Sequence, residues 1–252
     1  MIRKSGYRFS DQDHASIRTP MRRVIKRPPP KRAPAKARPA SRRAAAARPY
    51  HHGDLRRVLV DAAFELVGEG GAEAVSVREA ARRAGVSPGA PFRHFASRDA
   101  LLAAVAEEAQ RRFRAEIERA LAKAPADDPL QQFRCLGLAY LRWATRNPTH
   151  FEVISSRRFF DHDKSAAVSA DNAEVIGLTE RILRDAHARG QLGTSDLKQV
   201  LIGGRALVYG FARMAIDGHF PRWGVAPAEA ERTAESILDL FVSGIARRPG
   251  HS

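Results

Sequence analysis

Residues 76–95, SVREAARRAGVSPGAPFRHF, decide the fold of this 252-residue chain. Ser76 opens an S-x-x-E pattern, in which serine and glutamate satisfy free backbone N–H groups at a helix start. Gly85 follows where that helix ends and the backbone needs a positive φ angle. Ser87 and Pro88 predict a second helix, with serine as N-cap and proline at the first helical position. Two short helices joined by a glycine turn form a helix-turn-helix, whose second helix can enter a DNA major groove.

Helical patterns continue on both sides of this motif. An apolar stripe over residues 54–67, with Asp54 as N-cap, predicts a preceding helix that the glycines at 68, 70 and 71 terminate. Ser97 predicts the cap of a helix reaching about residue 124, because apolar residues recur every three or four positions. Further helices are predicted at 130–146, 148–160, 171–189, 196–217 and 227–247. We therefore expect an all-α protein, with a three-helix helix-turn-helix domain at residues 48–98 and a larger helical domain for effector binding and dimerisation at 99–252.

Positive charge is concentrated at the N-terminus of the chain. The net charge is +15, and 15 of the 43 lysines and arginines lie in residues 1–50, against two aspartates. Residues 1–47 are rich in proline and alanine and hold few residues able to form a core, so we predict a disordered basic tail. This tail is either an arm that contacts DNA phosphates or a solvated linker, and Met21 offers an alternative start of translation.

Several classes of protein are disfavoured by the sequence. A single cysteine excludes an internal disulfide, and no apolar run is long enough to cross a membrane, so a cytoplasmic location is expected. No nucleophile triad, phosphate loop or dinucleotide fingerprint is present, which argues against an enzyme and against a cofactor. We interpret the Asp161-His162-Asp163 cluster as a polar loop rather than a metal site, because no further ligand has a recognisable spacing.

The predicted helix at 196–217 mixes large apolar residues with glycine. Gly203, Gly204 and Gly210 interrupt it, although glycine inside a helix costs up to about 1 kcal/mol relative to alanine. That cost indicates close approach of another helix or space for a ligand. Together with apolar residues at 237–245, the segment predicts a four-helix homodimer interface. The alternative is that both helices pack within one chain.

Residues 54–102 resemble the TetR family of bacterial transcriptional regulators. The residues that carry the resemblance are Ser76, Ala80, Ala81, Ala84-Gly85-Val86-Ser87, Gly89, Phe92, His94-Phe95, Arg98 and Leu101-Leu102. The sequence at 50–56, which leads into the first helix, is similar to a subgroup whose C-terminal domain contains a Trp-His-Gly-like region. Here Val208-Tyr209-Gly210 stands at the corresponding place and departs from that triplet.

The resemblance implies a set of DNA-contacting residues. They are Ser76, Arg78, Ser87, Pro88, Gly89, Ala90, Phe92, Arg93, His94 and Arg98. His94 matches a phosphate contact of the family, Arg98 keeps the charge of a usual lysine, and Phe92 lacks the phosphate-binding hydroxyl of a usual tyrosine. Arg78 either reads a guanine edge or lies on a solvated face, and Arg93 faces either the groove or solvent.

Two further features of the second helix follow from residue type. Gly89 and Ala90 are small enough to let the helix approach the groove closely, and Ala90 can contact a thymine methyl group. Pro91 cannot donate the first hydrogen bond of this helix, so the recognition helix is expected to be stiffened and re-aimed. Phe95 is assigned to the core of the small domain.

An effector pocket in the larger domain is also implied by the resemblance. Candidate lining residues are Trp143, His150, Phe151, Phe159, Tyr209 and Met214, with ordinary core packing as the alternative. We expect a homodimeric regulator that binds an inverted-repeat operator in double-stranded DNA. A repressor released by a small apolar effector is the favoured form. The alternative is a nucleoid-type protein that binds DNA through its basic tail without sequence preference.

Overall fold

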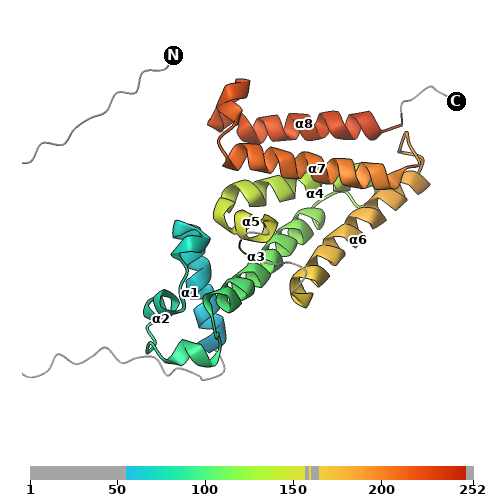
Figure 1. Cartoon of the computed structure of the whole chain (residues 1–252). Coiled ribbons are helices and arrows are strands. Elements are labelled where there is room, and N and C mark those ends of the chain that lie inside the picture. Colours follow the sequence, from blue (N-terminus) through green and yellow to red (C-terminus); the bar gives the residue numbers. More distant parts are fainter. Residues whose placement is uncertain (1–54, 157–158, 160–164, 248–252) are drawn as a thin grey trace, which may run out of the picture. The chain divides into compact units, whose positions relative to one another are not determined.

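The computed structural model describes residues 55–156, 159 and 165–247, all of which belong to one compact unit (Figure 1). The predicted Asp54 cap, the basic tail and the Asp161-His162-Asp163 loop lie outside the described residues. The described part is all-α, as predicted, and its only β-type pairing is an isolated bridge between Leu192 and Ala246. None of its helices is long and apolar enough to cross a membrane.

Eight α-helices and four short 3₁₀ turns make up the described part (Figure 1). The helices are α1 (Leu55–Gly70), α2 (Val77–Arg83), α3 (Arg98–Leu121), α4 (Pro129–Arg146), α5 (Pro148–Ser155), α6 (Ala166–Ala188), α7 (Leu197–Ile216) and α8 (Ala230–Ile245). The 3₁₀ turns are η1 (Ala72–Ala74), η2 (Ala90–Arg93), η4 (Phe220–Trp223) and η5 (Pro227–Glu229).

Helix starts follow the predicted caps where a serine or aspartate precedes the helix. Ser76 Oγ accepts a hydrogen bond from the Glu79 N–H at 3.0 Å, and Ser97 Oγ accepts one from the Ala100 N–H at 3.1 Å. Helix α6 begins five residues before the predicted position 171. Ser165 caps it, and Val168 is fully buried, so burial of the first turn extends the helix.

The glycines of α1 do not terminate it where the sequence suggested. The helix runs through Gly68 and Gly70, and the chain turns at Gly71, whose φ is +71°. A Cβ atom on Gly68 would lie 3.3 Å from Cε1 of His150, so this glycine serves a close contact with α5 inside the helix. The prediction of a stop at Gly68 was therefore wrong for a tertiary reason.

Helix α3 packs against α1 with one part of its length and against α4 and α6 with the rest, so one core runs through the described residues (Figure 1). Helix α4 lies at the centre of the C-terminal part and contacts α3, α6, α7 and α8. Helix α3 therefore joins the part that contains α1 to the part that contains α4 and α6 through packed side chains.

Two of the three glycines predicted for the dimer interface lie against neighbouring side chains of the same chain. A Cβ on Gly204 would lie 2.8 Å from Cζ of Phe133, and one on Gly203 would touch the Phe241 ring at 3.5 Å. Around Gly210, in contrast, a Cβ would meet nothing within 4 Å. The close approach of α7 to α4 therefore accounts for Gly204, whereas a Cβ on Gly203 would make an ordinary contact with α8 and one on Gly210 would meet open space.

Candidate nucleic-acid interface

The second helix of the predicted motif is a compact turn rather than an α-helix. Because Pro91 has no N–H group, the α-type hydrogen bond to the Ser87 carbonyl cannot form, and the Ala90 N–H donates to that carbonyl at 3.1 Å. The N–H groups of His94 and Phe95 both donate to the Pro91 carbonyl at 2.9 Å. Ser87 thus precedes the 3₁₀ turn η2 and does not cap an α-helix, which corrects the prediction.

Two buried side chains anchor the turn in the core. Phe95 is 2 % exposed, as predicted for a core residue, and Pro91 is fully buried. Gly85, which joins α2 to the turn, has the predicted positive φ of +69°. The buried side chains fix the backbone of η2, so that its outward side chains present a defined surface.

The predicted DNA-contacting residues lie mostly on the outside of this motif. Ser76, Arg78, Ser87, Pro88, Gly89, Phe92, Arg93 and His94 are exposed, whereas Ala90 and Arg98 are half-buried. The Phe92 ring is 51 % exposed beside two polar residues.

Ion pairing separates the arginines of this motif into two sets. Arg83 donates to the Glu69 carboxylate on α1 at 2.8 Å, and Arg82 donates to that of Glu79 at 2.9 Å. These hydrogen bonds lower the pKa of both carboxyl groups, so the pairs stay charged at neutral pH. Within the described part of the chain, neither Arg78 nor Arg93 forms an ion pair. Their charges are therefore available to an external anion.

Arg98 makes contacts inside the protein. Its Nε donates to the Val75 carbonyl at 3.0 Å and its Nη2 donates to the Ala72 carbonyl at 2.7 Å, with the Glu73 carboxylate at 3.4 Å. These bonds fasten the start of α3 to η1, immediately before α2. The contacts support a positioning role for Arg98, while its predicted phosphate contact stays a prediction.

Three of the predicted effector residues belong to one aromatic cluster. Trp143 and Phe151 are buried, and Tyr209 is 38 % exposed at the edge of the cluster. The Phe113 ring lies 5.1 Å from that of Trp143, and the Phe151 ring lies 6.1 Å from that of Tyr209. Phe159 and Met214 are half-buried against the same core.

Tyr140 is a member of the cluster that sequence reasoning missed. Its ring contacts those of Phe113 and Phe151, and its buried hydroxyl has no hydrogen-bond partner among the described residues. Burial raises the pKa of Tyr140 to about 12, although the Arg205 guanidinium, 4.8 Å above the ring, acts in the opposite direction. Its position one turn before Trp143 on α4 was the available signal.

His150 does not lie with the other effector candidates. Its Nε2 donates to the Phe64 carbonyl on α1 at 2.9 Å, and its ring stacks on the Phe64 ring at 3.8 Å. The sequence pattern placed it beside Phe151, but successive residues of a helix point about 100° apart. His150 therefore faces α1, away from the other effector candidates, and its place in an effector pocket stays a prediction.

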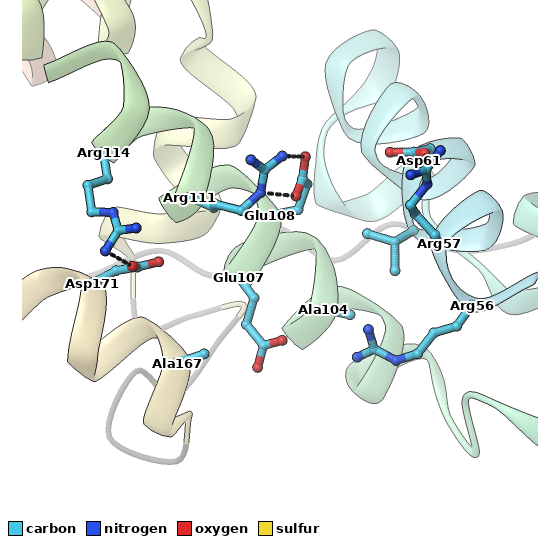
Figure 2. A pocket seen from close by; sticks show the side chains of 11 residues that line it. Arg56, Arg57, Asp61, Ala104, Glu107, Glu108, Arg111, Arg114, Ala167 and Asp171 are labelled. Atoms are coloured by element: carbon cyan, nitrogen blue, oxygen red, sulfur yellow. Dashed lines mark hydrogen bonds and ion pairs between the residues drawn. The ribbon is translucent and has the colours of Figure 1, made fainter. Parts of the chain in front are cut away.

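A separate charged groove of about 510 Å³ lies between α1, α3 and α6 (Figure 2). Its charged lining residues are Arg56, Arg57, Asp61, Glu107, Glu108, Arg111, Arg114 and Asp171. Arg111 pairs with Glu108 at 2.7 Å, and Arg114 reaches across to Asp171 on α6 at 3.0 Å. The Arg111 hydrogen bond lowers the pKa of Glu108, which keeps this carboxylate charged. Such a groove does not suit a small apolar effector.

Family models match both halves of this architecture. Residues 59–105 match bacterial regulatory proteins of the tetR family, and residues 133–241 match the tetracyclin repressor-like C-terminal domain. The chain belongs to the TetR family. The first range contains all the predicted DNA-contacting residues, and the second contains all the predicted effector residues.

A relative of known function agrees with the assignment of this chain to the TetR family. The HTH-type transcriptional repressor KstR of Rhodococcus jostii (strain RHA1) is 33% identical over 132 residues, which are 52% of this chain and 58% of KstR. The match thus spans less than two thirds of that repressor. These comparisons do not support the alternative of a nucleoid-type protein.

Solved structures share the fold. A protein of unknown function from Rhodococcus sp. RHA1 superposes with a TM-score of 0.69 at 31% identity, over 80% of this chain and 100% of that one. The TetR-family regulator PfmR from Thermus thermophilus gives a TM-score of 0.54 at 26% identity, over 75% and 99% of the two chains. KstR2 of Mycobacterium tuberculosis, at 17% identity and a TM-score of 0.56 over 77% and 96%, shows the fold alone.

Proposed function

We propose that this TetR-family protein is a homodimeric transcriptional repressor, which binds an inverted-repeat operator through α2 and η2 and is released by a small apolar effector. The observation that carries the proposal is a pair of exposed cations, Arg78 on α2 and Arg93 on η2, which form no ion pair in the described part of the chain and lie in the same motif as exposed Phe92 and His94. The remaining arginines of α2 are neutralised by carboxylates. Within α2 and η2, this distribution leaves positive charge at Arg78 and Arg93 available to DNA.

Different residues of this surface serve affinity and specificity. Phosphate contacts fix the register of a protein on DNA, whereas contacts to base edges carry the sequence information. Arg78 can bond a guanine through O6 and N7, a contact that discriminates by about 1–3 kcal/mol. His94 serves a phosphate, and the small Gly89 and Ala90 let η2 approach the groove.

The outer faces of α7 and α8 support a dimer. Ile202 is 57 % exposed on α7 and Leu240 is 74 % exposed on α8, and these helices contact each other. A Cβ on Gly210 of α7 would also meet open space. Two copies that pack these helices together would form a four-helix interface and would pair two DNA half-sites. A dimer also explains why an inverted repeat is the expected operator.

The aromatic cluster around Tyr140 is the proposed effector region. An apolar molecule would be recognised by Trp143, Phe151 and Tyr209, and the buried Tyr140 hydroxyl beside Arg205 offers one polar contact. Release then requires that the effector bind the DNA-incompetent conformation more tightly, with a coupling of about 1–3 kcal/mol. We place the protein in the cytoplasm because its target is chromosomal DNA.

Selection from random duplex DNA tests the proposal. The full chain and residues 48–252 would both be used at about 0.15 M salt, the physiological ionic strength. We expect both proteins to enrich the same inverted repeat, with the basic tail adding affinity and salt dependence. If no sequence is enriched and only the full chain retains DNA, the repressor proposal is wrong and the tail is the binding element.

A further inference from the structure

His150 packs closely against Phe64 and Gly68 of α1, a contact surface that we call the His150 seat. Its ring stacks on the Phe64 ring at 3.8 Å with an interplanar angle of 22°, and its Nε2 donates to the Phe64 carbonyl. One turn further along α1, the missing side chain of Gly68 leaves the space in which Cε1 of His150 lies. A polar ring that is only 5 % exposed thus fits a surface of α1 shaped by one glycine.

The Phe64 ring is held from both faces. The Arg112 guanidinium of α3 lies 3.9 Å from its centroid, and two groups at such distances cannot share one face of the ring. Arg112 itself is fixed by Glu108 at 2.6 Å and by Asp61 of α1 at 3.5 Å. The side chains of Arg112 from α3, Phe64 from α1 and His150 from α5 therefore form one stack that joins the three helices.

The same segment of α1 is attached to α2 on its other side. Glu65 and Glu69 follow Phe64 and Gly68 by one position, and both carboxylates approach Arg83 of α2, at 3.6 Å and 2.8 Å. A displacement of α1 at the His150 seat is thereby transmitted to α2 and to the turn that follows it.

On α5, the neighbouring residue points into the effector region. The Phe151 ring lies 5.9 Å from that of Tyr140 and 6.1 Å from that of Tyr209. Helix α5 is only eight residues long, so a shift on its Phe151 side moves His150 as well. The two side chains connect the aromatic cluster with α1 through a single turn of helix.

We propose that His150 is the positioning residue through which α5 holds α1, and with it the DNA-contacting turn, in the operator-binding arrangement. An effector that displaces Phe151 withdraws His150 from Phe64 and Gly68 and lets α1 move. This inference rests on the proposed repressor function. It assigns the regulatory contact of this chain to the surface of α1 formed by Phe64 and Gly68.

Protonation of the His150 imidazole opposes its buried position in this seat. Burial lowers the pKa of His150, and the nearby Arg112 charge acts in the same direction, while the hydrogen bond to Phe64 opposes both. The other charged groups of the stack, Asp61 and Glu108, are engaged by Arg112. A withdrawn, solvated His150 takes up a proton at its ordinary pKa, about 6.5, and the seated ring does not. The seat is therefore fully stable above a pH of about 6.5 and weakens as the pH falls toward the lowered value.

The test compares operator binding by the full chain and four variants, with the duplex recovered by selection as the probe. H150Q keeps a donor for the Phe64 carbonyl but cannot titrate, and H150A removes the side chain. G68A crowds the seat, and G177A is a matched glycine replacement on α6, where the new Cβ makes only an ordinary contact with Arg181. We expect G68A and H150A each to bind about tenfold more weakly than wild type at pH 7.5, within the usual range of allosteric coupling. G177A is expected to bind like wild type.

The pH dependence of operator affinity distinguishes a positioning role of His150 from a contribution to folding alone. Wild type is expected to lose operator affinity between pH 7.5 and 5.8, whereas H150Q binds well at pH 7.5 and keeps its affinity in acid. Equal affinities of wild type, G68A and H150A would overturn the inference. So would equal loss of affinity in acid for wild type and H150Q.

A measurement without DNA keeps the inference testable if selection yields no operator, the outcome that would defeat the proposed function. Hydrogen exchange at pH 7.5 would compare α1 and α2 with α7 and α8 in wild type, H150A and H150Q. We expect H150A to accelerate exchange in α1 and α2 only, and H150Q to restore protection. Unchanged exchange in α1, or equal acceleration in α7 and α8, would contradict the positioning role.

Discussion

In the α2–η2 region, the proposed functional side chains lie on the surface and the core beneath them is small. In the region of α4, α7 and α8, most aromatic side chains are buried, and the exposed faces of α7 and α8 carry apolar residues. The first arrangement suits a rigid partner that approaches from outside, such as DNA. The second suits a small molecule that enters the core and a second copy of the chain that covers an outer face. The α2–η2 region thus offers its contacts on the outer surface, whereas the α4, α7 and α8 region offers them in the core and on one apolar outer face.

Disrupting the proposed dimer face should have the largest effect. Leu240→Glu places a charge on the 74 %-exposed position of α8, so two copies would have to bury it unpaired. We expect a monomer by sedimentation and a loss of operator affinity of about a hundredfold or more, because a single half-site makes half of the contacts. Ile176→Glu alters a similarly exposed residue on α6 and serves as the control. A dimer that persists in the Leu240 variant would place the interface elsewhere.

The next effect concerns the support of the DNA-binding surface rather than the surface itself. Arg98→Ala leaves the carbonyls of Ala72 and Val75 without their guanidinium donors. We expect the free energy of unfolding to fall by about 1–3 kcal/mol, measured by thermal or urea denaturation. Arg93→Ala, at an exposed arginine without an ion pair in the described part, is the matched change and should leave stability nearly unaltered. Equal stability of both variants would show that the Arg98 contacts are not needed.

The same contrast explains what the sequence could predict. Helix starts at Ser76 and Ser97 and the turn at Gly85 depend on residues within four positions, and these predictions were confirmed. Local rules were also enough to identify Pro91 as the unusual residue of the second helix. They did not show that the missing N–H would convert the whole helix into a 3₁₀ turn.

Long-range contacts determine the partners of several residues that the sequence singled out. Gly68 reads as a helix stop, yet it accommodates a histidine that lies 82 positions further along the chain. His150 is a pocket candidate through the family resemblance, and only the orientation of α5 shows its contact with α1. Gly204 likewise makes room for Phe133 of α4 in the same chain. In each case the residue type was informative, but its partner depended on the tertiary fold.

Specificity should depend on the unpaired arginine of α2. Arg78→Ala is expected to weaken binding to the selected operator about tenfold and to leave binding to random DNA unchanged, because a base contact discriminates by about 1–3 kcal/mol. Arg82→Ala removes an arginine of the same helix that is already paired with Glu79, so its effect on specificity should be small. Fluorescence anisotropy with both duplexes measures the ratio. Equal losses on both DNAs for the Arg78 variant would assign this residue to the phosphates.

The smallest effect is expected for His94, and it differs from that of Arg78 in kind. His94 is exposed at the end of η2, where the family resemblance places a phosphate contact. Phosphates are the same at every sequence, so His94→Ala should weaken operator and random DNA alike, by about 0.5–1.5 kcal/mol for one hydrogen bond. Binding isotherms for the two duplexes at one salt concentration should shift in parallel. A shift confined to the operator would mean that η2 turns His94 toward the bases, and that the 3₁₀ turn reads sequence along its whole length.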